Sequence, residues 1–378
     1  SFMKSAGIYI HIPFCVVKCI YCDFYSITDR ENSIPRFINA IVKEIETCTV
    51  DVSNWKLETI FIGGGTPSLL NGRNIESILN ALERKYNLAQ KKEWTMEANP
   101  GEAPLERLKD FRSLGINRLS MGVQSLEPDL LKFLTRIHSA NQVFETYEHA
   151  RNAGFENINC DLIYSMPGQS WEIWERDLLR VLDLKPEHIS AYTLTLEKGT
   201  ELYQFVKKGQ VTMPEEDQTG GWFLKTHGIL NSHGYSAYEI SNFARPGMEC
   251  RHNLHYWRIH PYLAFGPSAH GFDGSNRWGN VRSLDQYLTQ IESGNTLISM
   301  KESLTQKNLT NELIGFGLRM NEGIDLAQIP ERYLNQFNTN LESARQKWND
   351  VLILRDSSVS LTKKGMVYTD AVGVDLML

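Results

Sequence analysis

The chain has 378 residues, of which 42% are hydrophobic and 22% are charged, and its formal net charge is -6 at pH 7. These values are typical of a folded globular protein, and they exclude a disordered chain, a collagen-like fibre and a long coiled coil. The acidic balance gives no overall attraction to nucleic acid, and no apolar run approaches the length of about 18 residues that predicts a membrane span.

Short apolar runs alternate with amphipathic stretches over the first half of the chain. We expect the apolar runs to form strands at Gly7–Ile12, Leu57–Ile62, Trp94–Ala98, Asn117–Val123, Ile158–Tyr164 and His188–Leu196. We expect helices at Ile34–Cys48, Ile75–Tyr86, Leu105–Leu114, Asn141–Ala153 and Trp171–Leu184. This alternation predicts an α/β fold in which helices cover a parallel sheet.

The number of these units separates two architectures. A closed eight-stranded barrel needs about 250 residues, whereas the six strand–helix units of this chain occupy roughly 190. The sequence therefore favours an open six-stranded (β/α)6 partial TIM barrel, and a doubly wound sheet is the alternative.

The character of the sequence changes after Leu196, where the polar stretch Glu197–Gln218 begins. We expect a core domain over residues 1–218, a linker with a mixed aromatic segment over 219–300 and a C-terminal domain over 301–378. In the last of these, helices followed by a short hairpin predict a small winged-helix-like domain. It carries no concentrated basic stripe, so we expect no nucleic-acid partner.

Three of the six cysteines, Cys15, Cys19 and Cys22, lie close together after the first expected strand. Clustered thiols without a disulfide framework predict metal chemistry in a reducing compartment. The chain begins with no secretory segment, so we expect that compartment to be the cytoplasm. An iron–sulfur cube usually has four Cys ligands, so a cube on these three would keep one iron open for another molecule. The alternative is a structural zinc ion with His11 as its fourth ligand.

The C-x-x-x-C-x-x-C loop formed by these cysteines resembles that of the radical S-adenosylmethionine (SAM) enzymes. The resemblance implies a [4Fe-4S] cluster on Cys15, Cys19 and Cys22, with SAM bound to the open iron through its amino and carboxylate groups. It also implies a reduced electron donor, because these enzymes cleave SAM reductively to a 5'-deoxyadenosyl radical.

Polar residues and glycines at the ends of other expected strands point to the same site. Gly63–Gly65 follow the second strand, Glu97 ends the third, Gln124 ends the fourth and Asp161 lies on the fifth. Functional groups of barrels gather at the carboxyl ends of the strands. Each residue alone is as well explained as a cap or a loop residue, but together with the cysteine loop they predict one site.

Longer motifs are similar to those of the oxygen-independent coproporphyrinogen III oxidase family. The motifs are Tyr9–Cys15, Gly63–Ser68, Glu97–Pro100, Gly122–Ser125 and Asp161–Tyr164. The resemblance implies that the cluster-bound SAM contacts Tyr9, Gly64 and Glu97. It also implies that a second SAM contacts Gly65, Thr66, Gln124, Arg136 and Asp161. For Arg136, a solvated charge at a helix end is the alternative.

One position departs from that oxidase pattern, which has a further Cys where this chain has Phe24. In this respect the chain resembles the sister branch of heme chaperones, the HemW proteins. The resemblance implies a protein that binds heme and passes it to heme-accepting proteins. An oxidase that decarboxylates coproporphyrinogen III is the alternative, and a homodimer and a membrane-associated acceptor are left open.

The segment Cys250–Trp257 contains His-Asn-x-x-Tyr-Trp, the stretch that binds heme in the HemW branch. The resemblance implies that His252, Tyr256 and Trp257 hold heme, with His255 as a second candidate ligand ahead of Cys250. A helical turn would place the three residues near one face. Without the resemblance, the same residue types favour a packed core with satisfied polar tips.

Overall fold

The computed structural model describes residues 2–378, and its main feature is a 12-stranded sheet. The strand order is β12-β11-β10-β9-β1-β2-β3-β4-β5-β6-β8-β7. The central strands pair in parallel, and they are β9 (Tyr262–Phe265), β1 (Lys4–Ile12), β2 (Trp55–Gly64), β3 (Glu93–Ala98), β4 (Arg118–Gln124), β5 (Ile158–Tyr164) and β6 (His188–Thr193). Strands that run in the same direction bring their carboxyl ends to one rim of the sheet.

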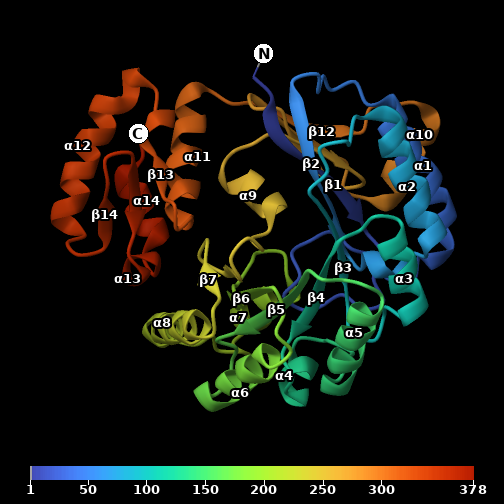
Figure 1. Cartoon of the computed structure of the whole chain (residues 1–378), viewed down its shortest axis with the longest axis horizontal. Helices are drawn as coiled ribbons and strands as arrows, with labels where there is room; N and C mark the ends of the chain where they lie inside the picture. The colour runs from blue at the N-terminus through green and yellow to red at the C-terminus, as the bar shows by residue number, and fades with distance from the viewer. Residues whose placement is uncertain (1) are drawn as a thin grey trace.

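Helices that connect the parallel strands lie around the outer face of the sheet (Figure 1). They are α1 (Ile34–Thr47), α2 (Gly72–Lys85), α3 (Leu105–Ser113), α4 (Pro128–Phe133), α5 (Ala140–Asn152) and α6 (Trp171–Leu182). Helix α1 shows why they pack there: Phe37, Ile41 and Ile45 recur at helical spacing and are fully buried. Each such side chain contributes about 1.5–3 kcal/mol when it leaves water.

The predicted open partial barrel is confirmed. The two end strands of the sheet, β12 (Ile298–Ser303) and β7 (Ser236–Ala237), do not pair with each other within the described residues. All six predicted strands are present, and β9 extends the parallel set beyond β1. The remaining strands are antiparallel additions: β8 (Asn242–Ala244), β10 (His270–Phe272) and β11 (Asn276–Asn280).

The segment 219–300, expected as a linker with a mixed aromatic segment that binds heme, contributes strands to both edges of the main sheet. Strands β7 and β8 extend the sheet from β6, whereas β9, β10 and β11 extend it from β1. The outer parallel strands would otherwise expose unpaired backbone groups, and these additions satisfy them. Helices α7 (Glu201–Lys207), α8 (Glu216–Ser232), α9 (Arg251–Trp257) and α10 (Leu284–Ser293) connect these strands.

A buried carboxyl group joins the first helix to this added region. Glu44 of α1 accepts hydrogen bonds from the Tyr287 hydroxyl at 2.6 Å, from the Gly266 backbone N–H at 2.8 Å and from Asn280 Nδ2 at 2.8 Å. Burial raises the pKa of Glu44 to about 7, although these three donors oppose the shift. Glu44 therefore fixes β9 and β11 against α1, on the side of the sheet beside β1.

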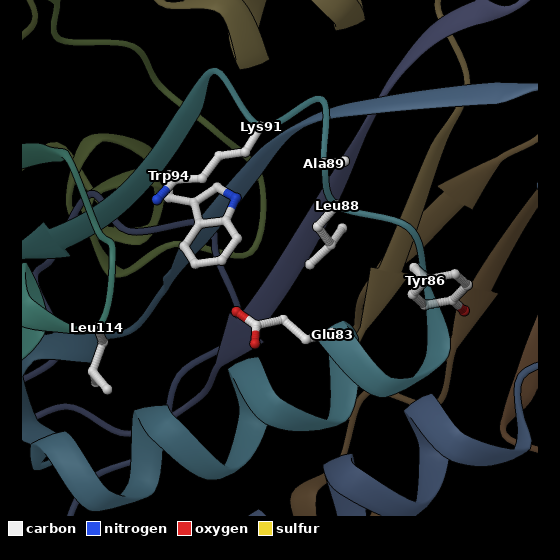
Figure 2. Close-up of a pocket in the computed structure, with 7 residues that line it drawn as sticks. All are labelled: Glu83, Tyr86, Leu88, Ala89, Lys91, Trp94 and Leu114. Carbon is white, nitrogen blue, oxygen red and sulfur yellow. The ribbon is translucent and has the colours of Figure 1, made fainter.

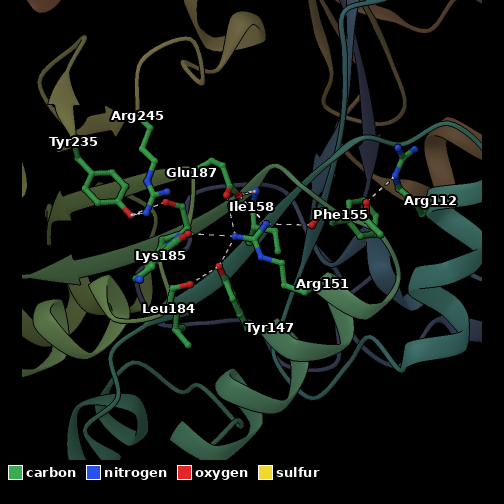
Figure 3. A network of polar contacts seen from close by, with 12 residues as sticks. Arg112, Tyr147, Arg151, Phe155, Ile158, Leu184, Lys185, Glu187, Tyr235 and Arg245 are labelled. Carbon is green, nitrogen blue, oxygen red and sulfur yellow. Dashed lines mark hydrogen bonds and ion pairs between the residues drawn. The ribbon is translucent and has the colours of Figure 1, made fainter. Parts of the chain in front are cut away.

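A second polar network fixes the opposite side of the sheet, at the amino ends of β5 and β6 (Figure 3). Arg151 of α5 donates to both carboxylate oxygens of Glu187, at 2.9 and 3.0 Å, and to the Tyr147 hydroxyl. Glu187 also accepts from the Ile158 backbone N–H at 3.0 Å. Because the network lies at the end of the strands remote from the carboxyl rim, it supports the scaffold.

The C-terminal region forms a separate small core, on the left of Figure 1. Its elements are α11 (Gln306–Arg319), β13 (Ile324–Asp325), α12 (Glu331–Lys347), β14 (Leu352–Leu354), β15 (Ser358–Leu361), α13 (Lys363–Met366) and α14 (Thr369–Leu376). The strands form a three-stranded antiparallel sheet with β15 in the centre. Among the described residues, none of the helices could cross a bilayer.

Candidate functional site

The loop between β1 and α1 carries Cys15, Cys19 and Cys22 at the carboxyl rim of the sheet. All three are free thiols; Cys15 is buried and the other two are partly exposed. The Cys15 backbone N–H donates to the Ile27 carbonyl at 3.1 Å, and the Ile27 N–H donates to the Pro13 carbonyl at 2.7 Å. These two bonds close the loop at its base, so the thiols are held on one short turn.

The same loop is anchored from behind by an apolar side chain. Ile20 is buried in a small cluster with Leu134 and Leu202. The Ile20 N–H donates to the Leu134 carbonyl at 3.4 Å, and the Leu202 N–H donates to the Ile20 carbonyl at 2.9 Å. Since Ile20 faces the protein, its neighbours Cys19 and Cys22 remain free to face a ligand.

The arrangement does not suit the alternative of a zinc ion with His11. His11 Nδ1 is 2.8 Å from the Tyr9 hydroxyl, and His11 Nε2 is 2.8 Å from the Tyr25 carbonyl, so both ring nitrogens have partners. Among the described residues, no three His, Cys, Asp or Glu side chains are gathered closely enough for a single metal ion. An iron–sulfur cube separates its thiolates more widely than one ion does, and three thiols on one loop fit it.

The glycine run after β2 brings backbone directly against this loop. Gly64 has a φ of +118°, and a Cβ atom there would meet the Ile12 carbonyl oxygen at 2.6 Å. The Gly65 N–H donates to that same Ile12 carbonyl at 2.7 Å, and the Thr66 N–H donates to the Phe14 carbonyl at 2.7 Å. Only glycine allows this approach, because other residues would clash and rarely adopt this conformation.

Two carboxyl groups lie on the inner face of the sheet below the rim. Glu97 Oε1 accepts from the Gly64 N–H at 3.0 Å, and no hydrogen bond of the described residues reaches its other oxygen. Asp161 Oδ1 accepts from Asn159 Nδ2 at 2.8 Å. Burial and, secondarily, Asp161 raise the pKa of Glu97 to about 8, and burial also raises the pKa of Asp161. The free oxygen of Glu97 can accept hydrogen bonds from the hydroxyl groups of a ribose.

Arg136 connects the cysteine loop to the neighbouring strand ends. Its Nη1 lies 3.6 Å from Cys19 Sγ, and its Nη2 donates to Asn99 Oδ1 at 2.9 Å and to the Gly122 carbonyl at 2.5 Å. Asn99 Nδ2 in turn donates to Thr66 Oγ1 at 3.0 Å. The arginine is therefore part of the rim and not a solvated helix-end charge, and Asn99 is a bridging residue that the sequence analysis did not single out.

Gln124 and Tyr9 complete the set of residues predicted at the rim. Gln124 ends β4 with a φ of +67°, a backbone conformation that costs a non-glycine residue about 1–3 kcal/mol. Tyr9 of β1 stacks on Phe61 of β2, with ring centroids 6.3 Å apart. The structure thus brings the cysteine loop together with Thr66, Glu97 and Arg136. The remaining predicted SAM residues lie on, or directly after, β1, β2, β4 and β5.

The segment expected to bind heme lies at the other end of the strands. His252 of α9 contacts Gly7 on β1 and Thr59 on β2. Each of these residues lies five positions before the end of its strand, so the contacts are about 16 Å from the rim. Figure 1 shows α9 between the sheet and the C-terminal region. His252 is therefore separated from the cysteine loop along the strands, although Phe61 lies between its ring and Tyr9.

His252 is a fully packed side chain with both ring nitrogens occupied. Its Nδ1 is 2.7 Å from Thr59 Oγ1, and its Nε2 is 2.6 Å from the Tyr256 hydroxyl. Its ring stacks on Phe61 at 5.3 Å, and only 1% of the residue is exposed. A Cβ atom on Gly7 would lie 2.8 Å from His252 Nδ1, so β1 packs directly on the imidazole. To bind iron, His252 would have to give up one of these two hydrogen bonds.

The sequence predicted that Trp257 shares a helix face with His252 and Tyr256. In the structure it lies on a different face. It packs on Phe316 of α11, with ring centroids 5.6 Å apart, and beneath the guanidinium of Arg319 at 4.5 Å. Five residues of helix rotate by about 500°, which leaves positions i and i+5 about 140° apart. The spacing i, i+4 therefore joins His252 to Tyr256, whereas Trp257 joins α9 to the C-terminal region.

An open cavity of about 400 Å³ lies away from both sites, near the C-terminal end of α2 (Figure 2). Lys91 extends its ammonium group over the ring of Trp94, 3.9 Å from the ring centroid, and Glu83 lies at the cavity edge. None of the residues predicted to bind the cluster, SAM or heme lines it.

Substitution Glu97→Ala should weaken SAM binding by about 1–3 kcal/mol, because a buried ribose hydroxyl of SAM would be left without its hydrogen-bond partner. This corresponds to roughly 5–150-fold in dissociation constant, measurable by equilibrium dialysis of the protein reconstituted without oxygen. Glu83→Ala changes an exposed carboxylate at the far cavity and is the matched control. Unchanged affinity in Glu97→Ala would remove Glu97 from the SAM site.

Comparison with known proteins is consistent with this geometry. The Radical SAM superfamily matches residues 9–181, and the HemN C-terminal domain matches residues 304–368. The heme chaperone HemW of Bacillus subtilis (strain 168) is 37% identical over 88% of this chain and 87% of its own length. The heme chaperone HemW of Lactococcus lactis subsp. lactis (strain IL1403) is 35% identical over 90% and 87% respectively.

A solved structure has the same fold over almost the whole chain. The coproporphyrinogen III oxidase HemN of Escherichia coli, a radical SAM enzyme, superposes with a TM-score of 0.85 over 99% of this chain and 90% of its own. The two sequences are 24% identical, so the likeness concerns the fold alone. It covers both the open sheet and the C-terminal region.

Proposed function

Because this chain belongs to the HemW family of radical SAM proteins, we propose that it is a heme chaperone, which binds heme and passes it to heme-accepting proteins. The observation that carries the proposal is its similarity to relatives named as heme chaperones, at 37% and 35% identity over most of each chain. Phe24, where the oxidase pattern has a further Cys, supports the same choice. Its side chain is 67% exposed beside Cys22.

Membership of the radical SAM superfamily implies a [4Fe-4S] cluster and SAM, and the rim fits both. The proposed ligands of the cluster are Cys15, Cys19 and Cys22. The proposed SAM contacts are Tyr9, Gly64, Gly65, Thr66, Glu97, Gln124, Arg136 and Asp161. When bound, the cluster would supply the electron for reductive cleavage of SAM. Arg136 would place positive charge beside Cys19 thiolate, and Glu97 would accept hydrogen bonds from ribose.

An oxygen-independent coproporphyrinogen III oxidase is the second candidate function. The likeness to the HemN fold, with a TM-score of 0.85, is the observation in its favour. One fold can serve several functions, so that likeness does not by itself select the reaction. Phe24 and the names of the more similar relatives favour the chaperone.

Hemin binding and coproporphyrinogen turnover separate the two candidates. The purified protein should bind about one hemin per chain with a Soret band, through an axial ligand from the protein. When loaded, it should release heme to apomyoglobin, whose own Soret band reports the transfer. The reconstituted, reduced protein with SAM should convert little or no coproporphyrinogen III.

The oxidase reaction is the decisive negative control. A known oxidase measured under the same conditions establishes that reductant and SAM are sufficient. Robust SAM-dependent decarboxylation by this protein would overturn the chaperone proposal and restore the oxidase function. Failure to bind hemin at all would also contradict it.

A further inference from the structure

A second cavity, of about 330 Å³, lies where α4 meets α5. It is lined by α4, by the turn that follows it and by the first residue of α5, and we call it the α4–α5 pocket. Its walls are largely apolar, with contributions from Pro128, Leu131, Ile137 and Ala140. The Ile137 side chain is 57% exposed, which is unusual for a large apolar residue and indicates a surface that another molecule can cover.

The α4–α5 pocket carries positive charge, although the whole chain has a net charge of -6. Lys132 and Arg136 are the charged side chains in its lining, because burial lowers the pKa of His138 to about 4 and leaves that ring neutral. The N-terminus of α5, at Ala140, adds the partial positive charge of a helix end. Exposed Asp129 of α4 does not line the pocket. The charge of the pocket therefore suits an acidic partner.

One residue joins the α4–α5 pocket to the cysteine loop. Arg136 lines the pocket, and its Nη1 lies 3.6 Å from Cys19 Sγ. The backbones are in contact as well, since the Ile20 N–H donates to the Leu134 carbonyl at 3.4 Å. A single turn of chain therefore separates the pocket from a proposed ligand of the cluster.

This turn directs two neighbouring side chains in different directions. Thr135 has a φ of +64°, a conformation that costs a non-glycine residue about 1–3 kcal/mol. The Thr135 N–H donates to the Lys132 carbonyl at 3.0 Å, and the Arg136 N–H donates to the Leu131 carbonyl at 2.8 Å. With the turn closed in this way, Arg136 reaches toward Cys19, whereas Ile137 is exposed beside the pocket.

We propose that the α4–α5 pocket is the docking site of a small acidic flavoprotein that donates one electron to the cluster. The inference rests on the part of the proposed function that places a cluster on Cys15, Cys19 and Cys22, and it does not depend on heme binding. Electron transfer weakens steeply with distance, so a donor has to dock close to the cluster. No other cavity described above lies beside the cysteine loop.

The size and chemistry of the pocket fit such a partner. Complexes between electron-transfer proteins bury less than about 1,200 Å² in total, so a small apolar recess with a positive rim is sufficient. The outer edge of a flavin ring carries methyl groups, which the apolar walls at Pro128 and Ile137 can receive. Lys132 would attract carboxylates of the partner and so increase the rate of encounter.

The proposed transfer moves one electron and no atoms. An anionic flavin hydroquinone leaves the complex as a neutral semiquinone, and the oxidised cluster gains the electron, so that its charge falls from 2+ to 1+. No proton and no further reactant is needed.

The test measures how fast flavodoxin hydroquinone reduces the reconstituted full-length protein, by stopped-flow absorbance without oxygen. The second-order rate constant of the parent should fall as salt is added, because salt screens the attraction between opposite charges. The double variant Lys132→Glu/Ile137→Asp should react at least tenfold more slowly at low salt. The matched controls Lys307→Glu and Val374→Asp, at exposed positions on α11 and α14, should react as the parent does.

Dithionite, a small reductant that needs no docking surface, separates this inference from the proposed function. It should reduce the same amount of cluster in the parent and in the double variant, as measured by electron paramagnetic resonance. If it reduces no cluster in the parent, the cluster assignment in the proposed function fails together with this inference.

Three other results would overturn this inference alone. The first is a parent that dithionite reduces and flavodoxin does not. The second is a double variant that reacts with flavodoxin at the rate of the parent. The third is a double variant impaired only in heme release to apomyoglobin, which would assign the α4–α5 pocket to a heme-accepting protein.

Discussion

Replacing Cys15, Cys19 and Cys22 together by Ala should abolish the iron–sulfur cluster. The parent, reconstituted without oxygen, should contain about four iron and four sulfide per chain, whereas the triple variant should contain neither. The reason is geometric: these thiols share one loop, closed at its base by the bonds between Cys15, Ile27 and Pro13. Iron and sulfide analysis, with the visible absorbance of the cluster, measures the outcome.

The control for this experiment uses a cysteine outside the loop. Cys48 follows α1 and is a free, partly exposed thiol, so Cys48→Ala should leave the iron content unchanged. The triple variant should remain folded, because the loop is also anchored through buried Ile20. A full cube in the triple variant would show that other residues hold it, and the assignment of the rim as the cluster site would fail.

The parallel sheet could be predicted from the sequence because its strands are buried on both faces. A run such as Ile158–Tyr164 is mostly apolar, with Asn159 and Asp161 as the exceptions, and stands between two helical patterns, so its type is clear without knowing its partners. The observed strand has the same limits as the predicted one. The rim followed from the same argument, since parallel strands end together and the polar residues came at their ends.

The antiparallel additions could not be predicted in the same way. Strands β7 and β8 are two and three residues long, and β12 is exposed along its whole length. Such segments have no periodicity that separates them from loops, and they become strands because an edge of the main sheet is available to pair with. Asn99 was missed for a related reason: its role depends on Arg136 and Thr66, which come from two other connecting segments.

The sequence of α9 supported two interpretations, a heme-binding segment and a packed core. A motif alone could not choose between them, and the side-chain packing in the structure favours the packed core. His252 and Tyr256 do meet, at the expected spacing of four residues, but they meet inside the protein. The Tyr256 hydroxyl is hydrogen-bonded to one nitrogen of the His252 ring, and the Thr59 hydroxyl is hydrogen-bonded to the other. A histidine beside aromatic residues is compatible with both a core and a ligand site, and only the tertiary contacts distinguish them.

Substitution His252→Ala should therefore lower the free energy of unfolding by about 2–4 kcal/mol, whether or not heme is present. It removes a buried ring from between Phe61 and Gly7 and leaves the Thr59 and Tyr256 hydroxyls without their partner. Chemical denaturation of the heme-free protein measures the change.

His233→Ala is the comparison for this measurement, since it truncates an exposed ring and should cost less than about 1 kcal/mol. If His252→Ala unfolds at the same denaturant concentration as the parent, the imidazole is not part of the core, and it becomes available again as a heme ligand. If it is strongly destabilised, a loss of heme in that variant reflects the loss of the fold around α9. Only heme binding measured together with stability can then distinguish a ligand from a core residue.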